Sequence, residues 1–237
     1  MSTNLYISLS HKSYLREPDS TELGRKIISE SINMMDALGF EQFTFKKLAA
    51  AIGSTEASIY RYFENKHKLL VYLVSWYWAW LHFTVTFQTH NIQNPRQRLR
   101  RAIEVLAKAG LDDDPNVSHI DERILYRVVV AESAKVYHTK EVDAENKDGY
   151  FLEFKRLCRH LAQMVLDINP AYPYPHALIS TAMEAAHQQM YFARHLPSLT
   201  EVKDAKHPEE ETTFFLKHLL FSAIDCTQKQ SKLYEHE

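Results

Sequence analysis

The sequence predicts an all-α protein with a small N-terminal head of three short helices, including a helix-turn-helix, and a larger C-terminal helical bundle. Apolar residues recur at spacings of three and four along most of the 237 residues, which is the period of an amphipathic helix. No run of alternating β-branched residues indicates a strand. Turn-forming segments divide the chain into about nine helical candidates.

The candidates begin with three short helices, followed by six longer ones. The expected helices are Ser20–Leu38, Phe45–Ile52, Glu56–Phe63, Lys66–His90, Pro95–Ala109, His119–Tyr137, Tyr150–Asp167, Pro175–His195 and Pro208–Lys229. Gly39 and Gly53 separate the first three, and segments such as 138–149 and 197–211 separate later ones. The chain shows no internal repeat.

Composition excludes several classes of function. The formal net charge of −2 gives no global basic field, so nucleic-acid binding would need a local patch. The five glycines are too scattered to form a phosphate loop or a nucleophile elbow, and no HExxH occurs. Two distant cysteines and an N-terminus unlike a signal peptide suit a cytoplasmic protein. We expect no cofactor and no metal.

The segment Leu69–Phe87 carries no charged side chain and includes all three tryptophans, Trp76, Trp78 and Trp80. Its length and composition make a membrane span one interpretation. Tryptophan favours the membrane interface, however, whereas these three occupy the middle of the segment. A helix buried inside a soluble protein is therefore the preferred interpretation.

Residues 44–70 read TFKKLAAAIGSTEASIYRYFENKHKLL. Thr44 is placed to cap a helix that buries Phe45 and Leu48 on one face. Gly53 supplies a left-handed turn, and a further short helix points Ile59 and Phe63 inward. A helix, a tight turn and a second helix at this spacing form a helix-turn-helix, whose second helix enters the major groove of DNA.

At these residues the sequence resembles the TetR family of one-component transcriptional regulators. The resemblance covers about a fifth of the chain and includes the family's most specific pattern, Tyr-x-His/Tyr-Phe-x-x-Lys, as YRYFENK. The residues that carry it are Ile27, Ile28, Met35, Gly39, Phe40, Phe43, Thr44, Leu48, Ala49, Gly53, Tyr60, Tyr62, Phe63, Lys66, Leu69 and Leu70.

The resemblance implies a homodimer with DNA-binding heads and a ligand-binding body. We expect a flexible extension over residues 1–19, a helix-turn-helix DNA-binding domain over 20–66, and a ligand-binding and dimerisation domain over 67–237. The positions that it implies for phosphate contacts are Thr44, Tyr60, Tyr62 and Lys66. The positions that it implies for reading base edges are Thr55, Glu56, Ala57, Ser58 and Arg61.

The lysines near two helix starts favour the same interpretation. A lysine at a helix N-terminus costs about 0.3–1 kcal/mol relative to an acid, yet Lys46 and Lys47 open one helix, and Lys66 and Lys68 open another. An incoming phosphate would explain both pairs. The alternatives are that the lysines are solvated surface charges, that the two tyrosines are core aromatics, and that Glu56 stabilises its helix dipole.

The body is expected to hold a small, largely apolar or aromatic effector, with packing core as the alternative for each aromatic residue. The candidate ligand-binding residues are Trp76, Trp80, His82, Phe83, Tyr126 and Phe154. The resemblance implies that the last two long helices form the dimer interface, and the apolar residues Phe214, Phe215, Leu219, Leu220 and Phe221 fit this expectation. Burial within the monomer is the alternative for these residues.

The preferred function is a DNA-binding repressor, not an enzyme, that an effector releases from its operator. Activation by ligand remains open. A metal-dependent helical-bundle enzyme is one rival, suggested by Glu184-x-x-His187, although a second such motif is absent. An interaction module that does not bind DNA is the other. A cluster of four arginines at 96, 98, 100 and 101 is expected to be a solvated helix face, with a DNA role as the weaker alternative.

Overall fold

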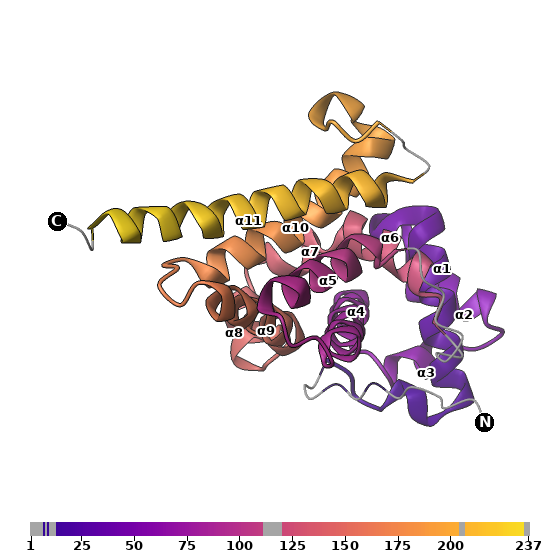
Figure 1. Cartoon of the computed structure of the whole chain (residues 1–237). Coiled ribbons are helices and arrows are strands. Elements are labelled where there is room, and N and C mark those ends of the chain that lie inside the picture. The colour runs from indigo at the N-terminus through magenta and orange to yellow at the C-terminus, as the bar shows by residue number, and fades with distance from the viewer. Residues whose placement is uncertain (1–6, 8, 10–12, 111–119, 204–206, 235–237) are drawn as a thin grey trace. The chain divides into compact units, whose positions relative to one another are not determined.

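The computed structural model describes residues 7, 9, 13–110, 120–203 and 207–234, and this part of the chain contains helices but no strand. Figure 1 shows the order of the helices along the chain. The α-helices are α1 Glu22–Gln42, α2 Phe45–Ala51, α3 Glu56–Tyr60, α4 Lys66–Thr89, α5 Pro95–Lys108, α6 Glu122–Glu132, α7 Ala134–Tyr137, α8 Val142–Lys147, α9 Leu152–Ile168, α10 Pro175–His195 and α11 Pro208–Tyr234.

The all-α prediction is confirmed, and α10 has the predicted bounds. The helix expected over 119–137 is instead two helices, α6 and α7, which meet at Ser133. The short helix α8 lies in the segment 138–149, which the sequence predicted as a break. Its six residues carry three charges and no helical apolar stripe. The helix is held instead by an ion pair between the buried carboxylate of Glu145 and Lys68 on α4.

The chain forms two compact units. The first comprises Met1–Trp80 with Ala109–Phe154, and the second comprises Leu81–Lys108 with Lys155–Glu237. Helices α4 and α9 each contribute residues to both units. The functional division into 1–19, 20–66 and 67–237 remains a prediction.

In the first unit, α1, α2 and α3 form the head around a core in which Ile28, Leu48 and Ile59 are fully buried. Threonine hydroxyls cap the start of each helix: Thr21 accepts from Gly24 N, Thr44 from Lys47 N, and Thr55 from Ser58 N. These caps explain why all three helices begin within two residues of the predicted positions.

The extension expected over residues 1–19 contacts the head where the structure describes it. Ser13 and Pro18 are buried, and the amide of Leu15 donates to the carbonyl of Tyr62 at 2.7 Å. The ring of Tyr14 meets the edge of the Tyr72 ring, with centroids 5.8 Å apart. Residues 1–6, 8 and 10–12 of the expected extension lie outside the described residues.

Helix α4 is long and apolar enough to cross a membrane, and no other described helix is. Its most apolar window is 72% buried within the protein. Trp76, Trp78 and Trp80 are each at most 3% exposed. Protein side chains therefore cover most of the surface that lipid would cover in a span, which agrees with the preferred interpretation of a buried helix.

In the second unit, α5, α10 and α11 pack together, and Figure 1 shows α10 and α11 running side by side. The buried amide of Asn169, at the end of α9, donates to the carbonyl of Ile224 on α11 at 3.1 Å. Lys217 on α11 pairs with Glu104 on α5 at 2.7 Å. Polar contacts thus supplement the apolar core of this unit.

Candidate nucleic-acid interface

The helix-turn-helix is formed by α2 and α3. Gly53 has a φ of 65°, the left-handed conformation that the predicted turn requires. The amide of Ser54 donates back to the carbonyl of Ala49 at 2.9 Å, which closes the turn. The rings of Phe45 on α2 and Tyr60 on α3 meet edge to face, with centroids 5.1 Å apart. This contact links the start of α2 to the end of α3.

Four predicted DNA-contacting residues of α3 and its C-terminal cap are exposed, whereas Ile59 is fully buried in the head. These exposed residues are Glu56, Ala57, Tyr60 and Arg61. Thr55 and Ser58 belong to the same predicted set, but their hydroxyls lie 2.9 Å apart and bond to each other. The predicted phosphate contact Thr44 is exposed at the start of α2, where its hydroxyl also caps the helix.

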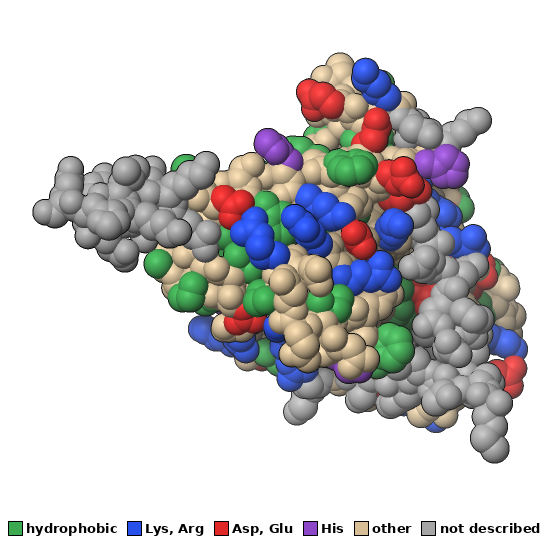
Figure 2. Space-filling view, viewed as in Figure 1, with side chains coloured by type: hydrophobic (Ala, Val, Ile, Leu, Met, Phe, Trp, Pro, Cys, Tyr) green, Lys and Arg blue, Asp and Glu red, His purple; other side chains and the backbone are tan. Residues whose placement is uncertain are grey.

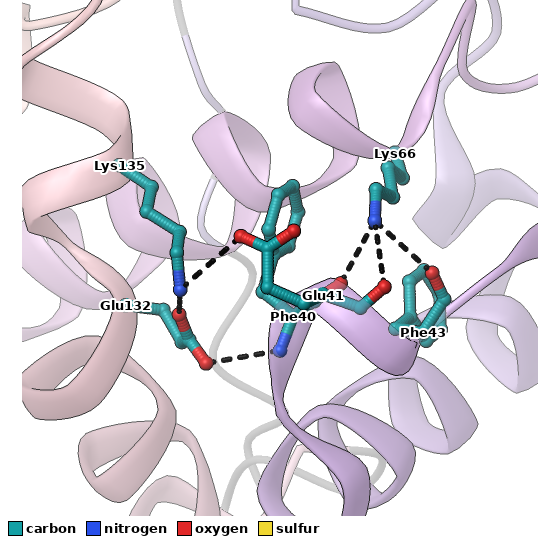
Figure 3. A network of polar contacts seen from close by, with 6 residues as sticks. All are labelled: Phe40, Glu41, Phe43, Lys66, Glu132 and Lys135. Atoms are coloured by element: carbon teal, nitrogen blue, oxygen red, sulfur yellow. Dashed lines mark hydrogen bonds and ion pairs between the residues drawn. The ribbon is translucent and has the colours of Figure 1, made fainter.

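The side chain of Lys66, which we expected to contact a DNA phosphate, forms hydrogen bonds within the head. Its ammonium group donates to the carbonyls of Phe40 at 3.0 Å, Glu41 at 3.2 Å and Phe43 at 3.3 Å (Figure 3). An ammonium group has three N–H donors, so these bonds occupy all of them. The positive charge also lies 4.5 Å from the centroid of the Phe40 ring. In this structure Lys66 binds the C-terminal end of α1, and a phosphate contact would require these bonds to break.

Tyr62 also differs from the expectation, because its side chain is only 2% exposed. Its hydroxyl lies 2.7 Å from the hydroxyl of Thr21, the cap of α1. The aromatic-core alternative therefore describes Tyr62, while the 46% exposed Tyr60 fits the predicted surface role. Tyr62 connects the end of α3 to the start of α1 and in this way positions α3.

The end of α1 is held from α6 as well, by a residue that the sequence analysis did not identify. Gly39 has φ 74° and ψ 160°, so the regular helix stops there and the amide of Phe40 has no helical acceptor. The carboxylate of Glu132 accepts from that amide at 2.9 Å (Figure 3). Lys135 binds the other oxygen of Glu132, and this hydrogen bond raises the pKa of Lys135. Only the tertiary structure brings these groups together.

Two further charged contacts hold the head within the first unit. Arg127 on α6 binds both oxygens of Asp36 on α1, at 2.8 and 2.7 Å, and this pairing raises the pKa of the arginine. Glu145 on α8 accepts from Lys68 at 2.9 Å and lies 3.0 Å from His67. The start of α4 therefore contacts α8. Lys68, like Lys66, uses its charge in contacts within the fold.

Four of the predicted effector contacts belong to the first unit. Trp76, Trp80 and Tyr126 are buried there, and Phe154 is half-buried. The centre of the aromatic cluster is Tyr77, whose ring lies 5.0–6.2 Å from the rings of Trp78, Trp80 and Tyr126. The Phe154 ring lies 4.7 Å from that of Trp78 and 5.5 Å from that of Tyr137.

The indole N–H of Trp78 donates to the Tyr137 hydroxyl at 2.6 Å. Tyr77 and Tyr137 were not among the predicted ligand contacts. The helical stripe that contains Tyr77 was visible in the sequence, but its meeting with Tyr126 depends on how α4 and α6 pack.

The other two predicted effector contacts, His82 and Phe83, belong to the second unit. Phe83 is 45% exposed and stacks on Phe87, so it does not share the burial of the other aromatic candidates. The His82 ring lies 5.3 Å from that of His160 on α9. Burial, followed by the nearby His160 and Arg156, lowers the pKa of His82, which favours the neutral imidazole.

The arginine cluster of α5 is largely paired with acids. Arg96 binds Asp225 through two hydrogen bonds of 2.8 Å, Arg98 contacts Asp167, and Arg101 contacts Glu104. Figure 2 shows basic and acidic side chains interleaved on this face. Such pairing is typical of a solvated helix face and leaves little net positive charge for DNA.

The rival metal site suggested by the sequence involves Glu184 and His187. His187 is buried on α10, and Glu184 precedes it by one helical turn. Within the described part of the chain, no group of three or more His, Cys, Asp or Glu is placed to hold a metal ion.

Comparisons with known proteins agree with the helix-turn-helix. Residues 27–73 match the family model described as bacterial regulatory proteins, tetR family. No curated protein sequence matches the chain. Solved structures match over most of it. The fatty acid degradation regulator FadR from Bacillus halodurans has a TM-score of 0.59 at 15% identity, over 82% of this chain and 96% of that one.

Two other solved structures have similar values. The TetR family transcriptional regulator PfmR from Thermus thermophilus has a TM-score of 0.57 at 14% identity, over 82% of this chain and 96% of that one. AibR, solved in complex with isovaleryl coenzyme A and operator DNA, has a TM-score of 0.55 at 17% identity, over 83% and 98%. The resemblance is confirmed at residues 27–73, which match the tetR-family model, and the chain has the fold of TetR-family regulators.

Proposed function

We propose that this chain is a DNA-binding transcriptional regulator that acts as a homodimeric repressor in the cytoplasm. The observation that carries the proposal is the helix-turn-helix of α2 and α3, whose second helix buries Ile59 and leaves Glu56, Ala57 and Tyr60 exposed. An exposed helix of this kind can enter the major groove and present side chains to base edges. The free cysteines Cys158 and Cys226 are compatible with a reducing cytoplasm.

The proposed roles at DNA follow from exposure and hydrogen bonding. Arg61 contacts a base edge, and Glu56 can accept a hydrogen bond from a cytosine amine. Thr44 and Tyr60 are the phosphate contacts of the predicted set that remain accessible. Thr55 and Ser58 hold the start of α3 and contribute surface beside it. Tyr62 and Lys66 position the recognition helix from within the head.

The proposed dimer uses α10 and α11. Phe214 on α11 is 71% exposed, and Phe215 on α11 and Tyr191 on α10 are each 39% exposed. Large apolar side chains exposed on two helices that pack together are what we expect of a surface that a second copy covers. To enter successive major grooves on one side of the duplex, the two recognition helices of a dimer have to lie about 34–36 Å apart.

The proposed effector is a small, largely apolar or aromatic molecule that contacts the aromatic cluster around Trp76, Trp80 and Tyr126. AibR, a structural relative, was solved with both isovaleryl coenzyme A and operator DNA. An effector releases the operator only to the extent that it binds the DNA-free arrangement more tightly. The three tryptophans of the first unit provide a fluorescence signal for testing candidate effectors.

Selection from a random-sequence duplex pool tests the proposal. The wild-type protein should enrich a site with two related half-sites, and Arg61→Ala should lower affinity for that site by at least about tenfold, the effect of losing a bidentate contact. Lys26→Ala is the control, because Lys26 is exposed on the same head but paired with Glu22. Absence of duplex binding by wild type at low salt would refute the DNA-binding proposal.

A further inference from the structure

The segment before α1 is fixed beside the end of α3, which places one cation near the proposed DNA surface. The Leu15 amide bonds to the Tyr62 carbonyl at 2.7 Å, and Tyr14 packs on Tyr72. Arg16 follows these anchored residues and is itself exposed. Its guanidinium carbon lies 5.4 Å from the centroid of the Tyr62 ring. Because the flanking residues are already ordered, little chain entropy would be lost when Arg16 binds a partner.

The interaction with Tyr62 leaves the hydrogen-bonding capacity of Arg16 intact. A guanidinium group over an aromatic face is attracted through its charge and keeps its N–H donors available. Glu17 and Asp19 are close in sequence, but within the described residues Arg16 makes no ion pair with either. Arg16 therefore presents a positive charge and a planar donor group to solvent.

Most of the other Lys and Arg side chains of the head already have partners within the protein, so few can bind phosphate. Residues 13–70 contain eight Lys and Arg residues. Five of them are engaged within the fold: Arg25 with the Asp19 carbonyl, Lys26 with Glu22, Lys47 with the Gln42 carbonyl, Lys66 with three carbonyls, and Lys68 with Glu145. Within the described part of the chain, Arg16, Lys46 and Arg61 have no hydrogen-bond or ion-pair partner.

Two of these cations follow in sequence the residues that join α2 to α3, and the third contacts the residue after α3 and its cap. Lys46 follows Phe45, whose ring packs on Tyr60, and Arg61 follows Tyr60. Arg16 lies over the ring of Tyr62, the next residue but one after Tyr60. A duplex that contacts the exposed end of α3 would bring its phosphates close to Arg16, because Arg16 lies over the ring of Tyr62, just after that end. Phosphate oxygens are preferred partners of arginine, because the guanidinium group can donate two parallel hydrogen bonds.

We propose that the N-terminal segment is part of the DNA interface and that Arg16 binds the sugar-phosphate backbone beside α3. This inference rests on the proposed function and extends it to a residue outside the helix-turn-helix. Arg16 supplies affinity that does not depend on base sequence, whereas the exposed residues of α3 supply sequence preference. The backbone contact also offsets the absence of a free donor on Lys66.

The salt dependence of binding tests the inference, with a fluorescein-labelled 30-bp random-sequence duplex as the probe. Each phosphate contact contributes about 0.9 to the slope of log affinity against log salt concentration. Arg16→Ala should therefore reduce this slope by about 0.9 for each bound head. The loss relative to wild type should be largest at low salt. Arg16→Lys should keep the slope, because it keeps the charge, and Lys26→Ala is the matched control on α1.

Different outcomes would overturn the role of Arg16 and the DNA-binding proposal on which it rests. Wild-type slope and affinity in Arg16→Ala, together with weaker binding in Arg61→Ala, would overturn the role of Arg16 and leave the DNA-binding proposal standing. No duplex binding by wild type would remove both. Thermal melts of the variants confirm that folded proteins are compared, and Arg16→Lys shows whether the charge at this position is the cause.

Discussion

Glu132 illustrates how one buried carboxylate can set the geometry of a helix end. Its exposure is 6%, and its two oxygens are used by the Phe40 amide and the Lys135 ammonium group. A buried N–H group without an acceptor costs about 1–3 kcal/mol. The irregular backbone at Gly39 is therefore stable only while an acceptor from α6 is present.

We expect Glu132→Ala to lower the free energy of unfolding by about 1–3 kcal/mol, because the Phe40 amide loses its acceptor. Glu132→Gln retains a carbonyl acceptor and should cost less. Urea denaturation measures both. Glu141→Ala removes an exposed carboxylate from the same unit and serves as the control. Equal stability of Glu132→Ala and wild type would contradict this account of the helix end.

His187 is a buried imidazole on α10, and burial lowers its pKa to about 4. The folded protein holds it neutral, whereas the unfolded chain takes up a proton as the pH falls below about 6.5. Its contribution to stability is therefore present above pH 6.5 and declines as the pH falls towards 4. The full loss is about 3 kcal/mol, since one pKa unit is worth about 1.4 kcal/mol.

Replacing His187 by Gln should flatten the decline of stability between pH 6.5 and pH 4. Denaturant midpoints measured across this range give the slope for each protein. His218→Gln, an exposed position on α11, shows the effect of removing an imidazole from the surface of the same unit. An unchanged slope in His187→Gln would mean that the buried imidazole does not control this decline.

At the scale of the helices, two glycines end elements in different ways. Gly53 adopts the left-handed helical conformation, which asparagine also tolerates. Gly39 combines φ 74° with ψ 160°, a region that is essentially restricted to glycine. A Cβ at Gly39 would meet Glu132 at an ordinary 3.6 Å, so the obstacle to substitution is the backbone and not space.

Gly39→Ala should therefore lower the unfolding free energy by about 1–3 kcal/mol through backbone strain. Gly53→Asn should cost clearly less, because the turn conformation is accessible to asparagine. Thermal melts of the two variants against wild type give the comparison. Equal losses at both positions would indicate that the two turns do not differ in the way their dihedral angles imply.

At the scale of the whole molecule, the exposed apolar surface of α11 has the largest expected consequence. A charged residue placed in a buried apolar interface has to be desolvated, which opposes association. Phe214→Glu with Phe215→Glu should convert a dimer into monomers and weaken duplex binding, because each protein would then present one head. Light scattering coupled to gel filtration measures the mass. Phe87→Glu, a comparably exposed Phe on α4, should leave the mass unchanged.

Sequence reasoning worked best where the signal was local. Apolar spacing, the breaks at Gly39 and Gly53 and the cap at Thr44 predicted α1, α2 and α3 to within a few residues. It worked less well at α8, where a buried carboxylate and not an apolar stripe holds the helix. At the candidate interface it expected the exposed residues of α3, and it expected phosphate contacts at Lys66 and Tyr62, whose polar groups bond within the head in this structure.

The sequence by itself determined the helical class, the turn at Gly53 and the position of the helix-turn-helix, because these depend on neighbours within a few residues. The tertiary structure decided which hydrogen-bond partners the polar groups have. Lys66 bonds to carbonyls 23–26 residues away, Tyr62 to a hydroxyl 41 residues away, and the Phe40 amide to a carboxylate 92 residues away. Partners at such separations meet only when the helices pack, so no local pattern encodes them.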